Sequence, residues 1–348
     1  MIIYSLWEML NFFFANVRIK RKQAVTLLCI ILWLILGMRS IELGLYDTKN
    51  VYYTLFNRVL RQDFKEFVIE LSILNEPLMN MITWIIAHAT RNFQVYLIIT
   101  SAFPIIAIRQ LLIEEDKDPV FGIAVFWGLY FFYGTFLIKQ MMAMSIIIFS
   151  YKYLKKRELV KFIICICVSA CIHKTSIFFI ITYIACKYIK TNKFFIVSIF
   201  PLMSIGMFAQ NIILNVIYKL PIFNFEAYIY YGIYSKGQGI TFSSFFYLGM
   251  IIICYYLKKK HDTDEYKDLL IISYMGCVLN SWSTIVMEFY RLALYFNVFN
   301  CLLLPYAFSE KNIKNQRLKR CILLGIMYIY AYVIAINTHS LPYMSLLD

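Results

Sequence analysis

Long apolar runs divide this chain, and they constrain its fold more than any other feature of the sequence. Four of them cover residues 24–38, 194–217, 240–257 and 321–337. At about 1.5 Å per helical residue, each run crosses or nearly crosses the roughly 30 Å hydrocarbon core of a bilayer. The runs are apolar on every face, whereas strands of a membrane barrel alternate in polarity. The pattern predicts an all-α, polytopic transmembrane protein.

Composition and charge agree with a membrane location. Of the 348 residues, 61% are hydrophobic, well above the roughly 45–50% of soluble domains. The net charge of +14 comes from 34 basic and 20 acidic residues. The basic residues gather in short loops between apolar runs, at 18–22, 152–161, 187–193, 257–267 and 311–320. Such loops face the cytoplasm in membrane proteins, so the charge predicts orientation and not a nucleic-acid partner.

With the basic loops inside, residues 1–348 form one integral membrane domain with outer segments at about 39–75 and 218–239. Five apolar runs separate the first two inside loops, so one run must be irregular, and residues 77–89 and 121–136 are both candidates. Residues 162–186, flanked by lysines, predict a shallow hairpin. We expect about 10–12 membrane helices, some short or re-entrant, an arrangement compatible with a GT-C-like architecture.

Ionisable residues inside or beside these runs are candidates for function, because a charge at the bilayer centre costs at least about 2.5–3.5 kcal/mol. The expected topology brings six of them to the outer face: Arg39, Asp47, Glu76, Lys139, His173 and Arg291. Structural alternatives stay open, since Arg39 could snorkel to the interface and Glu76 could cap a helix that begins at Pro77. His173 lies in a small, polar stretch that interrupts an apolar run, which favours function.

These residue types predict chemistry on an anionic, lipid-linked substrate. Cations bind and stabilise a diphosphate, and a carboxylate or imidazole acts as a general base. The sequence contains neither G-x-x-x-x-G-K-[ST] nor G-x-G-x-x-G, so the substrate would arrive already activated on its lipid. The nine cysteines fit no usual zinc spacing. We expect no cofactor, no metal and no disulfide framework.

Four stretches, taken in order, resemble the EpsG family of Wzy-like bacterial polysaccharide polymerases. Residues 38–56, MRSIELGLYDTKNVYYTLF, place Arg after a membrane helix and then Gly, Asp, Thr and Tyr. Glu76 opens the second stretch, residues 139–176 form the third, and residues 288–305 form the fourth. The third contains Lys139 where the family usually has Arg, which keeps the charge and loses bidentate geometry.

The resemblance implies a polymerase at the outer face of the bacterial cytoplasmic membrane. It would transfer a growing glycan from undecaprenyl diphosphate to the non-reducing hydroxyl of an incoming lipid-linked repeat unit. The implied partners are the undecaprenyl diphosphate-linked oligosaccharide, membrane lipid, and a chain-length regulator and flippase of the same pathway. The candidate residues are His173, Glu76 and Asp47 for catalysis, Arg39, Lys139, Gln140 and Arg291 for the diphosphate, and Tyr228 and Tyr231 for the glycan.

Two other activities remain as alternatives. One is a related membrane glycosyltransferase or ligase that hands the glycan to a terminal acceptor, which product length would distinguish. The other is a transporter or flippase for the lipid-linked unit. Transporters pair Gly- or Pro-broken helices in two halves around a site at the midplane, whereas the charges here are expected near one face.

Overall fold

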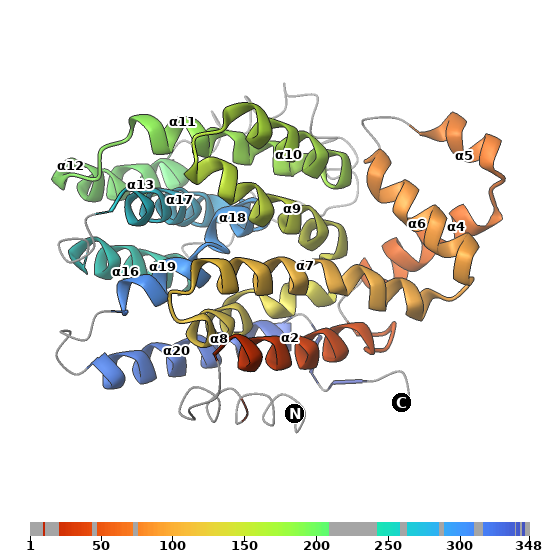
Figure 1. Ribbon diagram of the computed structural model, residues 1–348, viewed down its shortest axis with the longest axis horizontal. Coiled ribbons are helices and arrows are strands. Elements are labelled where there is room, and N and C mark those ends of the chain that lie inside the picture. The colour runs from red at the N-terminus through yellow and green to blue at the C-terminus, as the bar shows by residue number, and fades with distance from the viewer. Residues whose placement is uncertain are drawn as a thin grey trace.

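The computed structural model describes residues 10, 21–43, 47–71, 76–208, 242–257, 263–284, 289–309, 316–337, 339–341 and 343–344. Every regular element in these ranges is a helix, which confirms the all-α prediction. Four helices lie side by side in the order α2, α7, α9, α10 (Figure 1). Their bounds are Arg21–Gly37, Phe93–Glu115, Ile138–Lys155 and Leu159–Ile172.

Helices from the second half of the chain complete the bundle. The central one is α17 (Asp264–Ser281), which packs against α16 (Phe242–Leu257) and α18 (Phe289–Asn297). The remaining helices are α8 (Pro119–Leu129), α11 (Ile181–Tyr188), α12 (Lys193–Val197), α13 (Ile199–Phe208), α19 (Asn300–Ala307) and α20 (Gln316–Asn337). Helix α8 packs between α19 and α20. One continuous apolar core therefore joins both halves of the chain.

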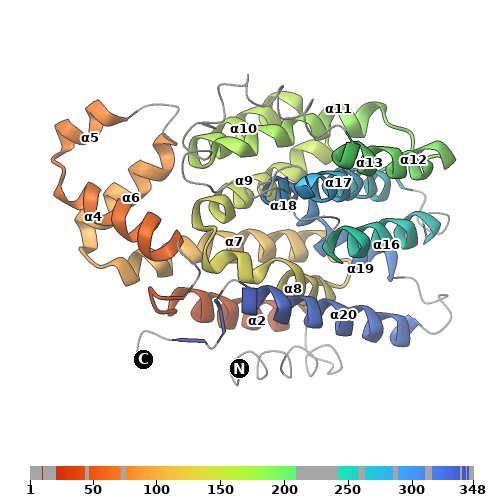
Figure 2. The ribbon, with the colours of Figure 1, turned by 180° about the vertical axis from the view of Figure 1, so that it is seen from behind.

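Three helices stand at one end of the bundle, where both views show them beside the main body (Figures 1 and 2). They are α4 (Thr54–Arg61), α5 (Phe64–Glu70) and α6 (Pro77–Thr90). In the outer segment at 39–75, amphipathic helices stay a prediction; in α5 Phe67 is buried, while both apolar residues such as Phe64 and Ile69 and the charged residues are exposed. Asp63 starts α5 with a capping box to Glu66.

Two helices in the described part of the chain are long and apolar enough to cross a membrane, Phe93–Glu115 and Leu318–Asn337. Four shorter apolar helices are Pro119–Leu129, Leu159–Ile172, Lys193–Gly206 and Phe242–Leu257. Many large apolar side chains on these helices are exposed, including Ile106, Ile164 and Ile329. The apolar, helical character is thus confirmed, and the number of crossings stays a prediction.

Several runs that are continuous in sequence are broken in space. Residues 292–308 divide into α18 and α19, and residues 121–136 divide into α8 and the 3₁₀ turn Phe131–Thr135. The return of the chain at 162–186 is confirmed, because the Tyr183 hydroxyl on its second arm donates at 2.8 Å to the carbonyl of Arg157, just before α10; its depth in a membrane stays a prediction. Broken helices at depth occur where backbone is buried in protein or lines a cavity.

Helices α7 and α9 run in the same direction, and an ion pair joins their C-terminal ends, with Lys155 Nζ 2.6 Å from a Glu115 carboxylate oxygen. Beside it, Arg157 pairs with Asp268 at 2.9 Å. Helix α9 carries Lys139 in its first turn and Lys155 in its last, about 24 Å apart at 1.5 Å per residue. The bundle therefore has a basic end at Lys155 and an opposite end at Lys139.

Candidate active site

Glu76 stands immediately before α6 in a backbone conformation that is rare for its residue type. Its φ of 56° and ψ of 65° lie in the left-handed region, which costs free energy for a residue with a Cβ. Pro77 follows as the first residue of α6 and its fixed φ suits that position. The Glu76 side chain makes no capping hydrogen bond to α6. The alternative that this carboxylate caps its helix is therefore wrong.

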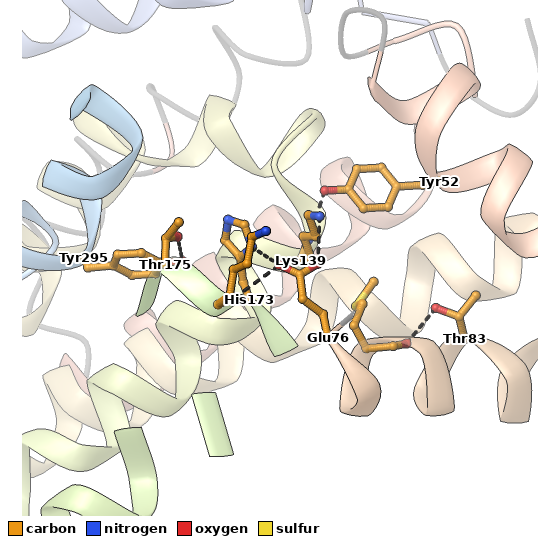
Figure 3. Close-up of polar contacts among 9 residues, drawn as sticks. Tyr52, Glu76, Thr83, Lys139, His173, Thr175 and Tyr295 are labelled. Carbon is orange, nitrogen blue, oxygen red and sulfur yellow. Dashed lines mark hydrogen bonds and ion pairs between the residues drawn. The ribbon is translucent and has the colours of Figure 1, made fainter. Parts of the chain in front are cut away.

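The Glu76 carboxylate instead faces His173 and Lys139 (Figure 3). Its Oε1 lies 2.5 Å from His173 Nδ1, and its Oε2 lies 2.8 Å from Lys139 Nζ. The backbone N–H of Lys174 also donates to Oε1, at 3.2 Å. Three donors from α9 and from the apex of the hairpin thus converge on one carboxylate, and they account for its strained backbone.

His173 occupies the break at the apex of the hairpin. Helix α10 ends there because His173 is extended, with φ −148° and ψ 110°. Its N–H still donates to the Ser169 carbonyl at 2.9 Å. Ser169 is fully buried, and its hydroxyl donates to the Ala143 carbonyl of α9 at 2.9 Å. A small polar residue at position 169 therefore lets α10 approach α9 and fixes the height of the imidazole.

Lys139 enters the cluster from the first turn of α9. Its backbone N–H donates to the Tyr52 hydroxyl at 3.2 Å, and Tyr52 itself is buried. The Lys139 side chain is 33% exposed, compared with 12% for Glu76 and 15% for His173. Since an ammonium has three donors, Lys139 can bind Glu76 and a second anion at the same time.

A second pair of charges borders this cluster. The Arg291 guanidinium of α18 lies 4.0 Å from an Asp47 carboxylate oxygen. Gln140, the neighbour of Lys139, donates its side-chain amide to the Arg291 carbonyl, which ties α18 to the start of α9. Arg291 is also close enough to His173 for its charge to lower the pKa of that imidazole. Asp47, Gln140 and Arg291 therefore surround the same site.

The charge states of the cluster follow from burial and from its hydrogen bonds. Burial raises the pKa of Glu76, but the hydrogen bond from His173 and the charge of Lys139 outweigh it and hold that pKa well below its usual range. Burial lowers the pKa of His173. Both residues lie at helix ends, outside the membrane-length helices. An anionic Glu76 accepts a hydrogen bond from the Nδ1–H of a neutral His173, so the lone pair is on Nε2.

Arg39 contacts α2 and α7. It is fully buried beside α7, and its guanidinium donates to the Leu36 carbonyl and, at 3.2 Å, to the Ser101 hydroxyl. A snorkelling arginine would be exposed, so that alternative is wrong. This placement also gives no support to the prediction that Arg39 binds the diphosphate beside Lys139, since the side chain is enclosed by protein.

The two glycan candidates, Tyr228 and Tyr231, and the whole segment at 218–239 lie outside the described residues. The structure adds polar groups that the sequence reasoning missed. These are Tyr52, the Lys174 amide, and the pair formed by the hydroxyls of Thr175 and Tyr295 at 3.3 Å (Figure 3). Tyr52 lies in residues 38–56, the first of the stretches that resemble the EpsG family, and this position could have identified it as a candidate.

The model of the EpsG family matches residues 23–346, nearly the whole chain. The chain belongs to the EpsG family. This is a family of Wzy-like polysaccharide polymerases. Comparisons with curated proteins and with solved structures find no match. The matched range includes Glu76, Lys139 and His173, so the cluster lies within the part of the chain that defines its EpsG membership.

Proposed function

We propose that this EpsG-family chain is a repeat-unit polymerase that acts on undecaprenyl diphosphate-linked glycans at the outer face of the bacterial cytoplasmic membrane. The observation that carries the proposal is the Glu76, His173 and Lys139 cluster, which pairs an oriented base with a cation. A transferase of this kind needs both groups, because a hydroxyl must lose its proton while a diphosphate leaves.

The residues of the site account for each bond and each proton in the reaction. The acceptor hydroxyl attacks the anomeric carbon of the donor glycan, the new glycosidic C–O bond forms, and the bond between that carbon and the diphosphate oxygen breaks. The hydroxyl proton goes to His173 Nε2, while Glu76 keeps the other ring nitrogen protonated and oriented. Lys139 and Arg291 stabilise the charge that develops on the departing undecaprenyl diphosphate. The products are a lengthened lipid-linked glycan and the free carrier.

The position of the cluster supports the outer face. The basic end of the bundle carries Lys155 and Arg157, and the positive-inside rule places such an end in the cytoplasm. Lys139 is about 24 Å away along α9, a distance comparable with the roughly 30 Å hydrocarbon core. Exposed apolar side chains on the helices between the two ends, such as Ile106 and Ile164, suit contact with lipid.

Glycan size in the native host tests the proposal. The deletion strain would carry the wild-type chain, His173→Ala or His88→Ala. His88 is an exposed histidine on α6 that contacts Trp84 and lies outside the cluster, so it is a matched control. We expect His173→Ala to remove the long-chain ladder and leave single repeat units, at unchanged protein levels, and His88→Ala to keep the ladder.

Other outcomes would overturn the proposal. A full ladder in His173→Ala would reject the imidazole as the base. Long chains that form but are not attached to their terminal acceptor would indicate a ligase. Single lipid-linked units that accumulate in the cytoplasmic leaflet would indicate a transporter.

A further inference from the structure

An apolar groove of about 510 Å³ opens along α7 and α9, on the face of the bundle that also includes Trp33 of α2. Its walls include Ile98, Phe103, Ile106 and Phe149. These walls are open to the surroundings, since Ile106 is 59% exposed and Phe149 is 42% exposed. A half-open apolar groove in a membrane protein is suited to a hydrocarbon chain that enters from the lipid.

The two ends of the groove differ in polarity. On α7 it runs from Ile98 to Glu115, about 25 Å at 1.5 Å per residue. Its far end contains Gln110, Glu114 and Lys152, the polar groups beside the basic end of the bundle. Its near end contains Trp33, whose indole N–H donates to the Ile98 carbonyl at 2.8 Å. The apolar part, from Ile98 to Ala107, is about 14 Å long, roughly half of a hydrocarbon core, and polar groups close it at the cytoplasmic side.

The near end of the groove leads toward the candidate active site. On α9 the lining begins at Ser145 and Ile146. Lys139 lies two helical turns before Ile146 on nearly the same stripe of α9, because seven residues are close to two turns. Protein covers the stripe between them, since Met142 and Ala143 are fully buried, so the approach is along α7. Ile98 lies about 25 Å before Glu115, and Lys139 lies about 24 Å before Lys155, the partner of Glu115. The near end of the groove is therefore level with Lys139 along the bundle.

We propose that this groove holds the first isoprenoid units of the lipid carrier, so that its diphosphate lies at Lys139 and its glycan lies beside His173. The inference rests on the proposed function and adds the place where the carrier binds. A single isoprenoid chain suits the groove because its walls are apolar, while the cation that its diphosphate requires lies beyond the near end. The buried apolar area would supply affinity, and Lys139 would set the register of the chain.

Photolabelling tests this inference without a measurement of polymerisation. The full-length protein in phospholipid nanodiscs would be labelled with an isoprenoid diphosphate that carries a benzophenone at its tail, and the labelled peptides would be mapped. We expect labels on α7 between Ile98 and Ile106 and on α9 between Ile146 and Phe149. Unlabelled undecaprenyl diphosphate should suppress them, and added phosphatidylglycerol should not. Equal labelling of the exposed face of α20, or suppression by phosphatidylglycerol, would overturn the inference.

A matched pair of variants narrows the test to the groove. Ile106→Trp fills a position in its wall, and Ile329→Trp makes the same change at a 68% exposed position on α20 that does not line it. We expect Ile106→Trp to reduce labelling about tenfold or more, because exclusion of two or three methylenes from an apolar surface costs that much in affinity. Ile329→Trp should label as the wild type does. Equal labelling of both variants would count against the groove.

The inference and the proposed function can fail separately. If the label maps to the groove while His173→Ala keeps a full glycan ladder, the carrier site stands and the polymerase proposal fails. If the ladder depends on His173 while the label maps elsewhere, the groove inference alone fails.

Discussion

His173 Nδ1 lies 2.5 Å from Glu76 Oε1, although 97 positions separate the two residues in the chain. One comes from the break in the 162–186 hairpin and the other from the left-handed residue before α6. Neither backbone position is a regular helical one, and both are held by groups that converge on the same carboxylate. Because the left-handed backbone of Glu76 persists only where its surroundings hold it, the pair indicates a site that is assembled before substrate binds.

Replacement of Glu76 by Gln tests whether the carboxylate orients the imidazole. Gln keeps the shape but loses the charge that favours the Nδ1 proton, so we expect the polymerisation rate to fall about 10²- to 10⁴-fold. Glu158→Gln is the matched control, since Glu158 is also paired with a lysine, Lys161, but lies outside both the cluster and the groove. The measurement is the glycan ladder formed by purified protein in proteoliposomes. Equal rates in the two variants would contradict the assignment.

The pH dependence of the reaction follows from the state of His173. A base must be unprotonated, and burial lowers the pKa of His173 from its ordinary value of 6.5. Activity should therefore be maintained as pH falls to 6.5 and decline only below that value. Glu76 raises the pKa of His173, so the residual activity of Glu76→Gln should decline at a still lower pH. An acidic limb that moves toward higher pH in this variant would contradict the hydrogen-bonded pair.

Much of the candidate site could be predicted from the sequence, because ionisable residues are costly in apolar runs and are rare there. Glu76, Lys139 and His173 each interrupt or border such a run, and the structure brings all three together. The hairpin around His173 was also predictable, since lysines flank a run too short for two full crossings. The helical class follows from the absence of alternating polarity in the long runs.

The remaining features depend on information that a run of apolar residues does not contain. The length of such a run predicts where a residue lies along the bundle, but not which side of its helix faces the protein. The sequence therefore predicts that Arg39 lies at a helix end, but not that it is buried in contact with Ser101. Residues 292–308 are apolar except for Asn297, Asn300 and Pro305, and their division at Val298 and Phe299 lies between the two asparagines. Asn297 donates to the Gly276 carbonyl and Asn300 to the Tyr130 hydroxyl, partners that only the fold determines. The hydrogen bond from Lys139 to the Tyr52 hydroxyl joins segments whose pairing only the fold determines.

Two substitutions at Lys139 separate charge from geometry. Lys139→Met removes the cation that faces both Glu76 and the departing diphosphate, and we expect at least about a 10²-fold loss of polymerisation. Lys139→Arg keeps the charge and adds bidentate donors, so it should keep much more of the activity. Lys161→Met is the control, because Lys161 forms an exposed pair with Glu158. The readout is the initial rate in proteoliposomes, and similar losses for Met and Arg would indicate that shape matters more than charge.

Close packing around α8 gives a prediction for stability that does not depend on the proposed chemistry. A Cβ at Gly122 would lie 2.8 Å from the Cys301 carbonyl oxygen and 2.3 Å from Leu112 Cδ2, whereas a Cβ at Gly325 of α20 would meet nothing within 4 Å. Gly122→Ala should therefore destabilise the protein by about 1–3 kcal/mol through overpacking. Gly325→Ala should stabilise it by about 0.5–1 kcal/mol, because Ala favours a helix over Gly. Thermal unfolding in one detergent compares the two variants. A Gly122→Ala protein as stable as the wild type would mean that α8 and α19 are less closely packed than the structure places them.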